Sequence, residues 1–244
     1  MFIDFILLFL FAGVPYYIYF EKTKKLEKEK IFFLSAFLFI CGTILVSIFP
    51  NEASMPIVVI AFLSSLFSLY RANQTTNLYK LSYYILFFNA PALIMFKAEQ
   101  TILYAISLLL GLLGLYLIGK YYERNYGSAN YQSISGITLV TPYAGFFLTT
   151  YLTALALYPP LPNSILFLYG ILTTEMNMMW YLIVIIIFFG NFLIAVRVMA
   201  KTVFGKPNTN VHYVDLTLSE KRMHLGIVII LLLLSVVALK EILS

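Results

Sequence analysis

The chain has 244 residues, of which 61% are hydrophobic and only 11% are charged, and its mean hydropathy is +0.91. A water-soluble domain of this composition would have too few polar side chains to cover its surface. The net charge is +5, but the basic residues fall in short loops between apolar runs. Membrane topology explains that pattern better than a nucleic-acid partner does. The single cysteine, Cys41, excludes an intramolecular disulfide. The composition therefore predicts an all-α, multi-pass membrane protein.

The first apolar run, Phe2 to Phe20, has no basic segment before it and no small-residue cleavage site after it. We interpret it as a retained span rather than a signal peptide. The loop that follows, residues 21–30, contains five Lys and three Glu, and the positive-inside rule predicts that it is cytoplasmic and the amino terminus outside. With a second span from Ile31 to Phe49, residues 1–55 are predicted to form two amino-terminal transmembrane helices.

Residues 56–244 are predicted to form one helical bundle with no soluble domain. The next three predicted spans are separated by a cationic loop at residues 71–80 and followed by another at 120–126, both on the side of the first basic loop. With the later apolar runs, the total is about eight to nine spans. The predicted spans of this bundle are Pro56 to Tyr70, Leu81 to Phe96, Thr101 to Gly119, Gly136 to Tyr158, Met178 to Phe204 and Leu225 to Leu243.

One predicted transmembrane helix is broken at Pro159–Pro162, because Pro159, Pro160 and Pro162 cannot continue a helix. The short apolar segment after the prolines, Asn163 to Met178, leaves the topology open. If it crosses the membrane, the basic loop from Arg197 to Arg222 lies outside. If it is re-entrant, that loop returns to the cytoplasmic side and the positive-inside rule holds throughout.

Three stretches together resemble the antiporter-like membrane subunits of respiratory complex I, Mrp-type antiporters and membrane-bound hydrogenases. The first, Gln74 to Tyr84, is similar to the family's Gln-Thr-Asp-Leu-Lys-Arg-Leu-Leu-Ala-Tyr-Ser-Ser, with Asn77 in place of the acid, Lys80 as the cation, and Tyr84 retained. Asn89 falls where the family often has His or Asn.

The second stretch is the proline break, with Pro159 and Pro160 at the family's Ile-Pro-Pro turn, which leads into a discontinuous helix. The third resembles the family's Tyr-x-x-Arg-x-x-x-Arg-x-Phe-Phe-Gly followed by Asp-Leu-x-x-x-Glu. Its counterparts in this sequence are Arg197, Lys201, Gly205, Asp215 and Glu220. The resemblance covers residues 56–244 and implies half of an antiporter-like bundle, equivalent to the carboxy-terminal of the family's two inverted repeats.

In that family, ion movement is attributed to Lys and Glu residues inside the bilayer, and such residues are costly in lipid. Here the acid or lysine of the discontinuous helix would fall near Phe167 or Leu168, where the sequence is apolar. The remaining ion-pathway candidates are Glu175, Asn89 and Lys80, and we expect Lys80, Arg197 and Lys201 to anchor helix ends at the interface. The spacing of His212 and His224 is poor for a metal site, so no metal is expected.

The resemblance implies a membrane subunit of a redox-driven, proton- or ion-pumping respiratory complex in the cell's inner membrane, of the NADH–quinone oxidoreductase or hydrogenase kind. The chain would be structural or bridging, without a catalytic centre, cofactor or complete ion pathway of its own. Its partners would be lipids and other membrane subunits that carry iron–sulfur clusters, flavin, haem or quinone. Two alternatives stay open: a half-channel that contributes to proton or sodium translocation with a neighbouring subunit, and a stand-alone small transporter.

Overall fold

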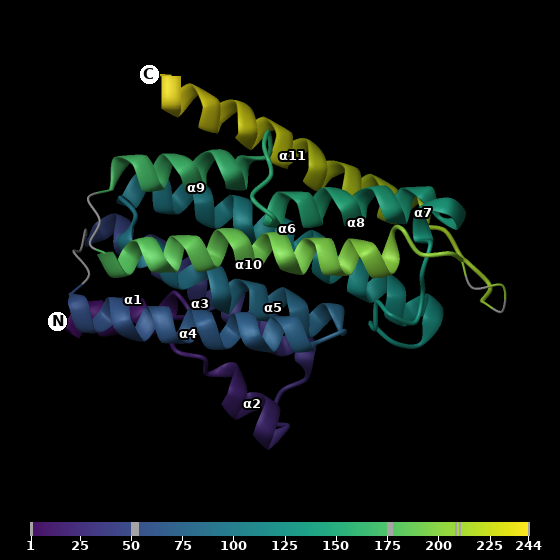
Figure 1. Ribbon diagram of the computed structural model, residues 1–244, viewed down its shortest axis with the longest axis horizontal. Helices are drawn as coiled ribbons and strands as arrows, with labels where there is room; N and C mark the ends of the chain where they lie inside the picture. The colour runs from purple at the N-terminus through teal and green to yellow at the C-terminus, as the bar shows by residue number, and fades with distance from the viewer. Residues whose placement is uncertain (1, 50–53, 175–177, 208, 210, 244) are drawn as a thin grey trace.

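The computed structural model describes residues 2–49, 54–174, 178–207, 209 and 211–243. Outside the helices of this part there is one isolated bridge, between Asn77 and Asn130. The helices are α1 (Phe2–Leu10), α2 (Tyr17–Thr23), α3 (Lys28–Ile48), α4 (Met55–Gln74), α5 (Leu78–Asn89), the 3-10 helix η1 (Ala90–Met95), α6 (Ala98–Tyr126), α7 (Ile137–Val140), α8 (Pro142–Leu155), α9 (Pro162–Thr173), α10 (Met178–Thr202) and α11 (Leu218–Leu243) (Figure 1).

Six helical stretches are long and apolar enough to cross a membrane, which is compatible with the multi-pass membrane protein that the composition predicts. They are α3, α4, α5 together with η1, α6, α10 and α11. The expected number of eight to nine spans is therefore not reached in the described part of the chain. The number of spans is lower than expected because two of the long apolar stretches in the sequence are divided into short helices.

The first divided run is Phe2 to Phe20, which is two short helices rather than one span. Helix α1 ends at Leu10, the backbone turns with Ala12 at φ 54°, and Gly13 donates to the carbonyl of Leu8 at 2.7 Å. Pro15 then lacks the N–H that a continuing helix would need. Helix α2 stands apart from the long helices, at the bottom of Figure 1. The prediction of a continuous first span is wrong for this reason.

The second divided run surrounds the prolines. Helix α8 has 14 residues and α9 has 12, and neither is long enough to span a bilayer of about 30 Å at 1.5 Å per residue. In Figure 1 they follow one another along the long axis of the molecule, with the connecting segment between them partway along it. Pro142 and Pro162 each open a helix, in the first-turn positions where proline's missing N–H costs nothing.

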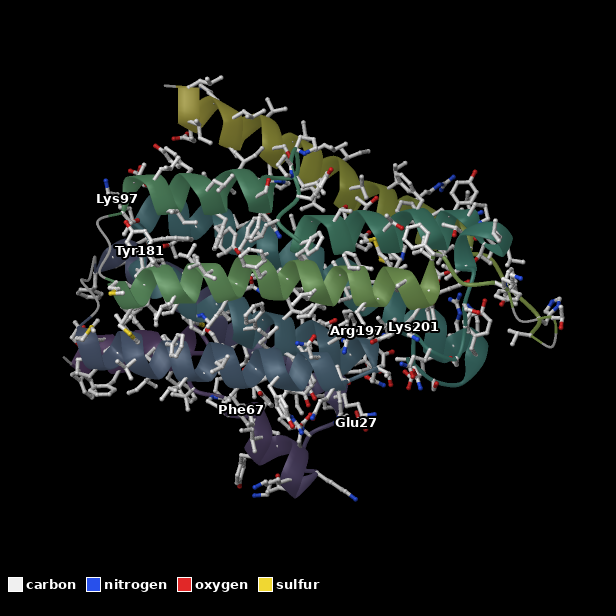
Figure 2. The ribbon with its side chains drawn as sticks, in the orientation of Figure 1. Glu27, Phe67, Lys97, Tyr181, Arg197 and Lys201 are labelled. Atoms are coloured by element: carbon white, nitrogen blue, oxygen red, sulfur yellow. The ribbon has the colours of Figure 1, made fainter. Side chains whose placement is uncertain are left out.

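All four basic loops consequently lie at one end of the bundle, here called the basic end. Contacts between the loops fix this arrangement: Arg71 and Lys80 both reach Glu21, and Arg124 reaches Glu220. Of the 16 Lys and Arg residues, only Lys97 and Lys240 lie at the other end. Figure 2 shows Lys97 far from Arg197 and Lys201. In the described part of the chain, α8 and α9 follow one another from one end of the bundle to the other (Figure 1).

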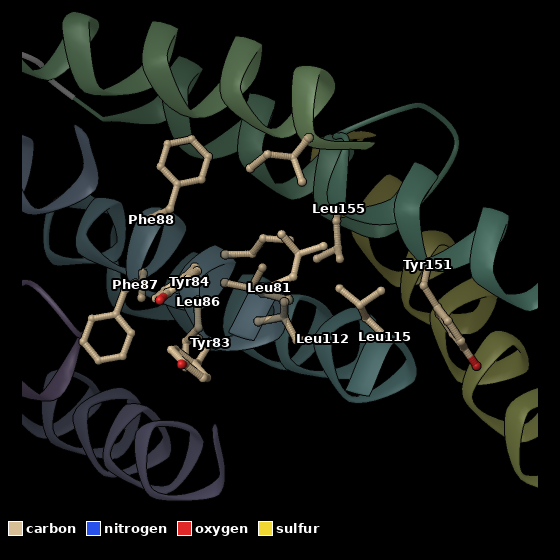
Figure 3. Close-up of a cluster of buried hydrophobic side chains, with 14 of the residues drawn as sticks. Leu81, Tyr83, Tyr84, Leu86, Phe87, Phe88, Leu112, Leu115, Tyr151 and Leu155 are labelled. Carbon is tan, nitrogen blue, oxygen red and sulfur yellow. The ribbon is translucent and has the colours of Figure 1, made fainter. Parts of the chain in front are cut away.

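Helix α5 with η1 is the centre of the bundle, and 89% of this segment is buried. Large side chains of α5 meet leucines of α6 and α8 in one cluster (Figure 3). Asn77 caps the start of α5, since its Oδ1 accepts from the backbone N–H of Lys80 at 3.1 Å. After Asn89 the helix tightens into η1, because Pro91 cannot donate to the preceding turn.

Candidate functional site at the basic end

The densest polar cluster of the described residues surrounds Glu21, which is the fifth residue of α2. One carboxylate oxygen accepts from Tyr83 at 2.5 Å and from Tyr84 at 2.6 Å. The second carboxylate oxygen, Oε2, accepts from a guanidinium nitrogen of Arg71 at 2.7 Å. Lys80 Nζ lies 3.2 Å from the first oxygen, Oε1. The side chain of Glu21 is only 12% exposed. Helix α2 is thus tied to α4 and α5 through one carboxylate.

The surroundings of Glu21 keep its carboxyl ionised. Burial by itself raises the pKa of this carboxyl. The hydrogen bonds from Tyr83 and Tyr84, with the charge of Lys80 and the hydrogen bond from Arg71, outweigh burial and lower the pKa below the usual range. A carboxylate held in this way does not exchange protons near neutral pH. The cluster is suited to fixing α2 against the bundle, and a proton-carrying role has no support in its geometry.

Sequence reasoning identified Lys80 and Tyr84 but missed Glu21, Arg71 and Tyr83. The sequence suggests Lys80 as an ion-pathway residue or an interfacial anchor, and in the structure it lies in the first turn of α5 as a partner of Glu21. Tyr84 donates to Glu21 and also accepts from Arg71 at 3.1 Å. Arg71 lies close to the motif and could have been singled out. Glu21 is 50 residues earlier, and no local pattern connects the two.

Two further motif positions have structural roles at the same end. Arg197 on α10 caps the carboxy-terminal end of α4: its guanidinium donates to the carbonyls of Ala72, at 2.8 Å, and Asn73. The interfacial anchoring expected for Arg197 is therefore a specific bond between two helices. Lys201 lies one turn further on and is exposed. Gly205 passes close to Ser135, and a Cβ at residue 205 would lie 2.6 Å from that of Ser135.

Asp215 and Glu220 organise the start of α11. Thr217 and Glu220 form a capping box, in which the backbone N–H of Thr217 donates to Glu220 Oε2 at 2.9 Å and the N–H of Glu220 approaches Thr217 Oγ1 at 3.4 Å. Glu220 also pairs with Arg124 at 2.6 Å, and Asp215 pairs with Lys221 at 2.7 Å. Glu220 thus caps α11 and links it to α6, whereas Asp215 forms an ion pair with the first turn of α11.

Asn89, another ion-pathway candidate, lies deep in the bundle and pairs with Asn191 of α10. The two amides donate to each other, at 3.0 and 2.6 Å, and Asn89 also donates to the carbonyl of Ile85. Both side chains are almost fully buried. A reciprocal amide pair satisfies both partners and fixes α5 against α10. Sequence reasoning identified Asn89 but not its partner, which is 102 residues away.

We expect Asn89→Leu to lower the free energy of unfolding by about 1 kcal/mol, because it leaves the Asn191 amide unpaired in an apolar interior. Asn191→Leu should cost a similar amount. The double variant Asn89→Leu/Asn191→Leu should cost less than the sum of the two, which a double-mutant cycle in mixed micelles measures. Additive losses would contradict the pairing.

The last ion-pathway candidate, Glu175, lies outside the described residues. No group of three or more His, Cys, Asp or Glu side chains that could hold a metal ion occurs among the described residues. His224, which the sequence does not favour as a metal ligand, is buried. Its Nδ1 lies 2.9 Å from the hydroxyl of Tyr151 on α8. It therefore joins α11 to α8.

The proline break presents a different kind of surface. Tyr158 is 63% exposed, and Pro159 and Pro160 are exposed as well. The peptide bond between the two prolines is cis. No backbone N–H in the described part of the chain donates to the carbonyl of either proline. The tip of the break, residues 158–160, therefore faces away from the bundle interior, while Leu157, Leu161 and Asn163 on its flanks are buried.

Comparison with known proteins gives no assignment. No family model matches the chain, and no curated protein matches its sequence.

Proposed function

We propose that this chain is a membrane subunit of a larger redox-driven, ion-pumping complex, of the complex I or hydrogenase type, in which it bridges other membrane subunits. It has no catalytic centre in this proposal, and the partner subunits carry the iron–sulfur, flavin, haem or quinone cofactors. The inner membrane of the cell is its location, with the basic end towards the cytoplasm.

The observation that carries the proposal is the exposed tip of the proline break. Helices α8 and α9 extend about 21 and 18 Å to either side of it, and in this proposal the two cross the bilayer together, with the tip near its middle. Irregular backbone does not face lipid at this depth, because its polar groups would be unsatisfied there. The exposed surface of Tyr158, Pro159 and Pro160, with two proline carbonyls that accept no backbone N–H of the described residues, supports a contact with another protein chain at this place.

The positions of the charged residues support a bridging role over a pumping one. In the described parts of the six long helices, every Asp, Glu, Lys and Arg lies within about two turns of a helix end. The position after the break that carries a charge in antiporter-like proteins falls near Phe167 or Leu168, and both are apolar: Phe167 is buried against Phe96 and Tyr104, and Leu168 is exposed. Ionisable residues inside the bilayer mark ion pathways, and in the described parts of these helices they are confined to the ends.

The assignment to the antiporter-like type is supported by the order of the three motifs and by the pair α8 and α9, which we interpret as halves of one discontinuous helix. Four motif residues make specific contacts at the basic end: Lys80, Tyr84, Arg197 and Glu220. The chain accordingly represents half of an antiporter-like bundle in this proposal.

Photocrosslinking in the native membrane tests the proposal. A photoreactive phenylalanine analogue at position 158 should form an adduct with one larger membrane polypeptide that copurifies with subunits absorbing as flavin, haem or iron–sulfur proteins. The same analogue at Phe146, which is 54% exposed on α8, serves as the matched control for a surface facing lipid. Adducts at position 158 with lipid alone, or purification without any cofactor-bearing subunit, would contradict the proposal.

A further inference from the structure

The contact between α6 and α9 is lined by polar side chains along one face of α6. Gln100, Tyr104 and Ser107 follow one another at helical spacings of four and three residues, so they share this face. Gln100 donates to Thr173 near the end of α9 at 2.6 Å, and Ser107 donates to Asn163 near its start. We call this contact the polar seam, defined by Gln100, Tyr104, Ser107, Asn163 and Thr173.

Three polar atoms of the seam have no hydrogen-bond partner among the described residues: Gln100 Oε1, the hydroxyl of Tyr104 and Asn163 Nδ2. The residues are 7%, 0% and 0% exposed. An unsatisfied polar group in an apolar interior costs about 1–3 kcal/mol even by protein measurements, and three of them along one contact are rarely left so. The described residues around these atoms supply no partner for them, and buried groups of this kind are commonly satisfied by ordered water.

The seam is open at one end and closed at the other. At the end opposite the basic loops it meets a cavity of about 190 Å³ that Gln100 and Thr173 line with Lys97 and Glu99. From Gln100 to Ser107 the rise along α6 is about 10 Å. Beyond Asn163 the seam is blocked, because the side chain of Leu155 lies against Gly111.

We propose that the polar seam binds a short file of water molecules, which enters at this cavity and stops at Asn163 beside the proline break. Water fits because it donates and accepts, as the carbonyl oxygen, the hydroxyl and the amide require. Buried water commonly makes about three bonds to such groups. The file hydrates the interior to about half its depth and ends at a neutral amide, so it admits water without connecting the two ends. This inference is independent of the assembly proposed above.

Hydroxyl-radical footprinting with synchrotron X-rays on the full chain in lipid nanodiscs tests the water file, because radicals formed from bound water label the side chains that the water contacts. Tyr104 should be oxidised several-fold faster than Tyr151. The two tyrosines are equally buried, but the hydroxyl of Tyr151 already pairs with His224. Equal rates for the two tyrosines would overturn the proposal.

A second variant locates the water. Ser107→Leu should fill the inner part of the seam and bring the ratio of Tyr104 to Tyr151 oxidation towards one, whereas the smaller Ser107→Ala should leave the ratio high. A ratio that Ser107→Leu leaves unchanged, with Tyr151 still protected as in the native fold, would also overturn the proposal.

Discussion

Replacing Glu21 with alanine is expected to lower the free energy of unfolding by about 3–5 kcal/mol, because it removes the shared partner of two cations and two tyrosines in a largely buried cluster. Glu21→Gln keeps the shape but not the charge and should cost about 2–3 kcal/mol. Unfolding by SDS in mixed micelles, followed by the fluorescence of the single tryptophan, Trp180, measures both losses.

A matched control lies six residues further along. Glu27 pairs with Lys30 at 3.1 Å, but both side chains are mostly exposed, and such surface pairs contribute less than about 1 kcal/mol. Glu27→Gln should therefore leave stability almost unchanged. If the two glutamine variants lost equal stability, the Glu21 cluster would have no special role in fixing α2.

The same cluster predicts a specific acid sensitivity. Because the native pKa of Glu21 is lowered, its stabilising contribution is complete above the unfolded pKa of about 4.3 and is lost as the pH falls through the native pKa. The stability difference between the wild type and Glu21→Gln should therefore shrink below about pH 4 and stay constant between pH 6 and 8.

The second large effect is expected at Gly114 on α6. A Cβ added there would lie 2.4 Å from ring carbons of Tyr151, so Gly114→Ala must displace that ring and weaken its hydrogen bond to His224. We expect a loss of about 2–4 kcal/mol, combining overpacking with the lost interhelical bond. The close approach of α6 to α8 depends on this small residue.

Gly226 on α11 provides the control, since nothing lies within 4 Å of a Cβ built there. Gly226→Ala should be neutral or stabilise by up to about 1 kcal/mol, because alanine favours a helix over glycine. The two substitutions are chemically identical, so their difference measures packing alone. A stable Gly114→Ala variant with an unchanged Tyr151 environment would show that α6 and α8 do not meet as described.

The sequence motifs single out residues that lie near helix ends, whereas the apolar runs predict more spans than the described part of the chain contains. Asn77, Lys80, Tyr84, Arg197 and Glu220 were singled out from motifs, and each makes a specific contact at the basic end. Caps and short-range charge spacing are local features, so a sequence displays them directly. The roles of Glu21 and Asn191 could not be predicted from the sequence, because their partners are 50 and 102 residues away. Glu21 lies in a basic segment and Asn191 in an apolar one, and neither segment has a local pattern that indicates the contact.

By itself, the sequence determined that the chain is helical, with basic loops between apolar runs long enough to span a membrane, because composition and hydropathy are sums over local residues. Only the tertiary structure decided that Phe2 to Phe20 is divided at Gly13–Pro15 and that α8 and α9 follow one another along the bundle as two short helices. The number of crossings depends on how short segments align in space. That alignment follows from long-range packing between helices, which a hydropathy profile does not describe.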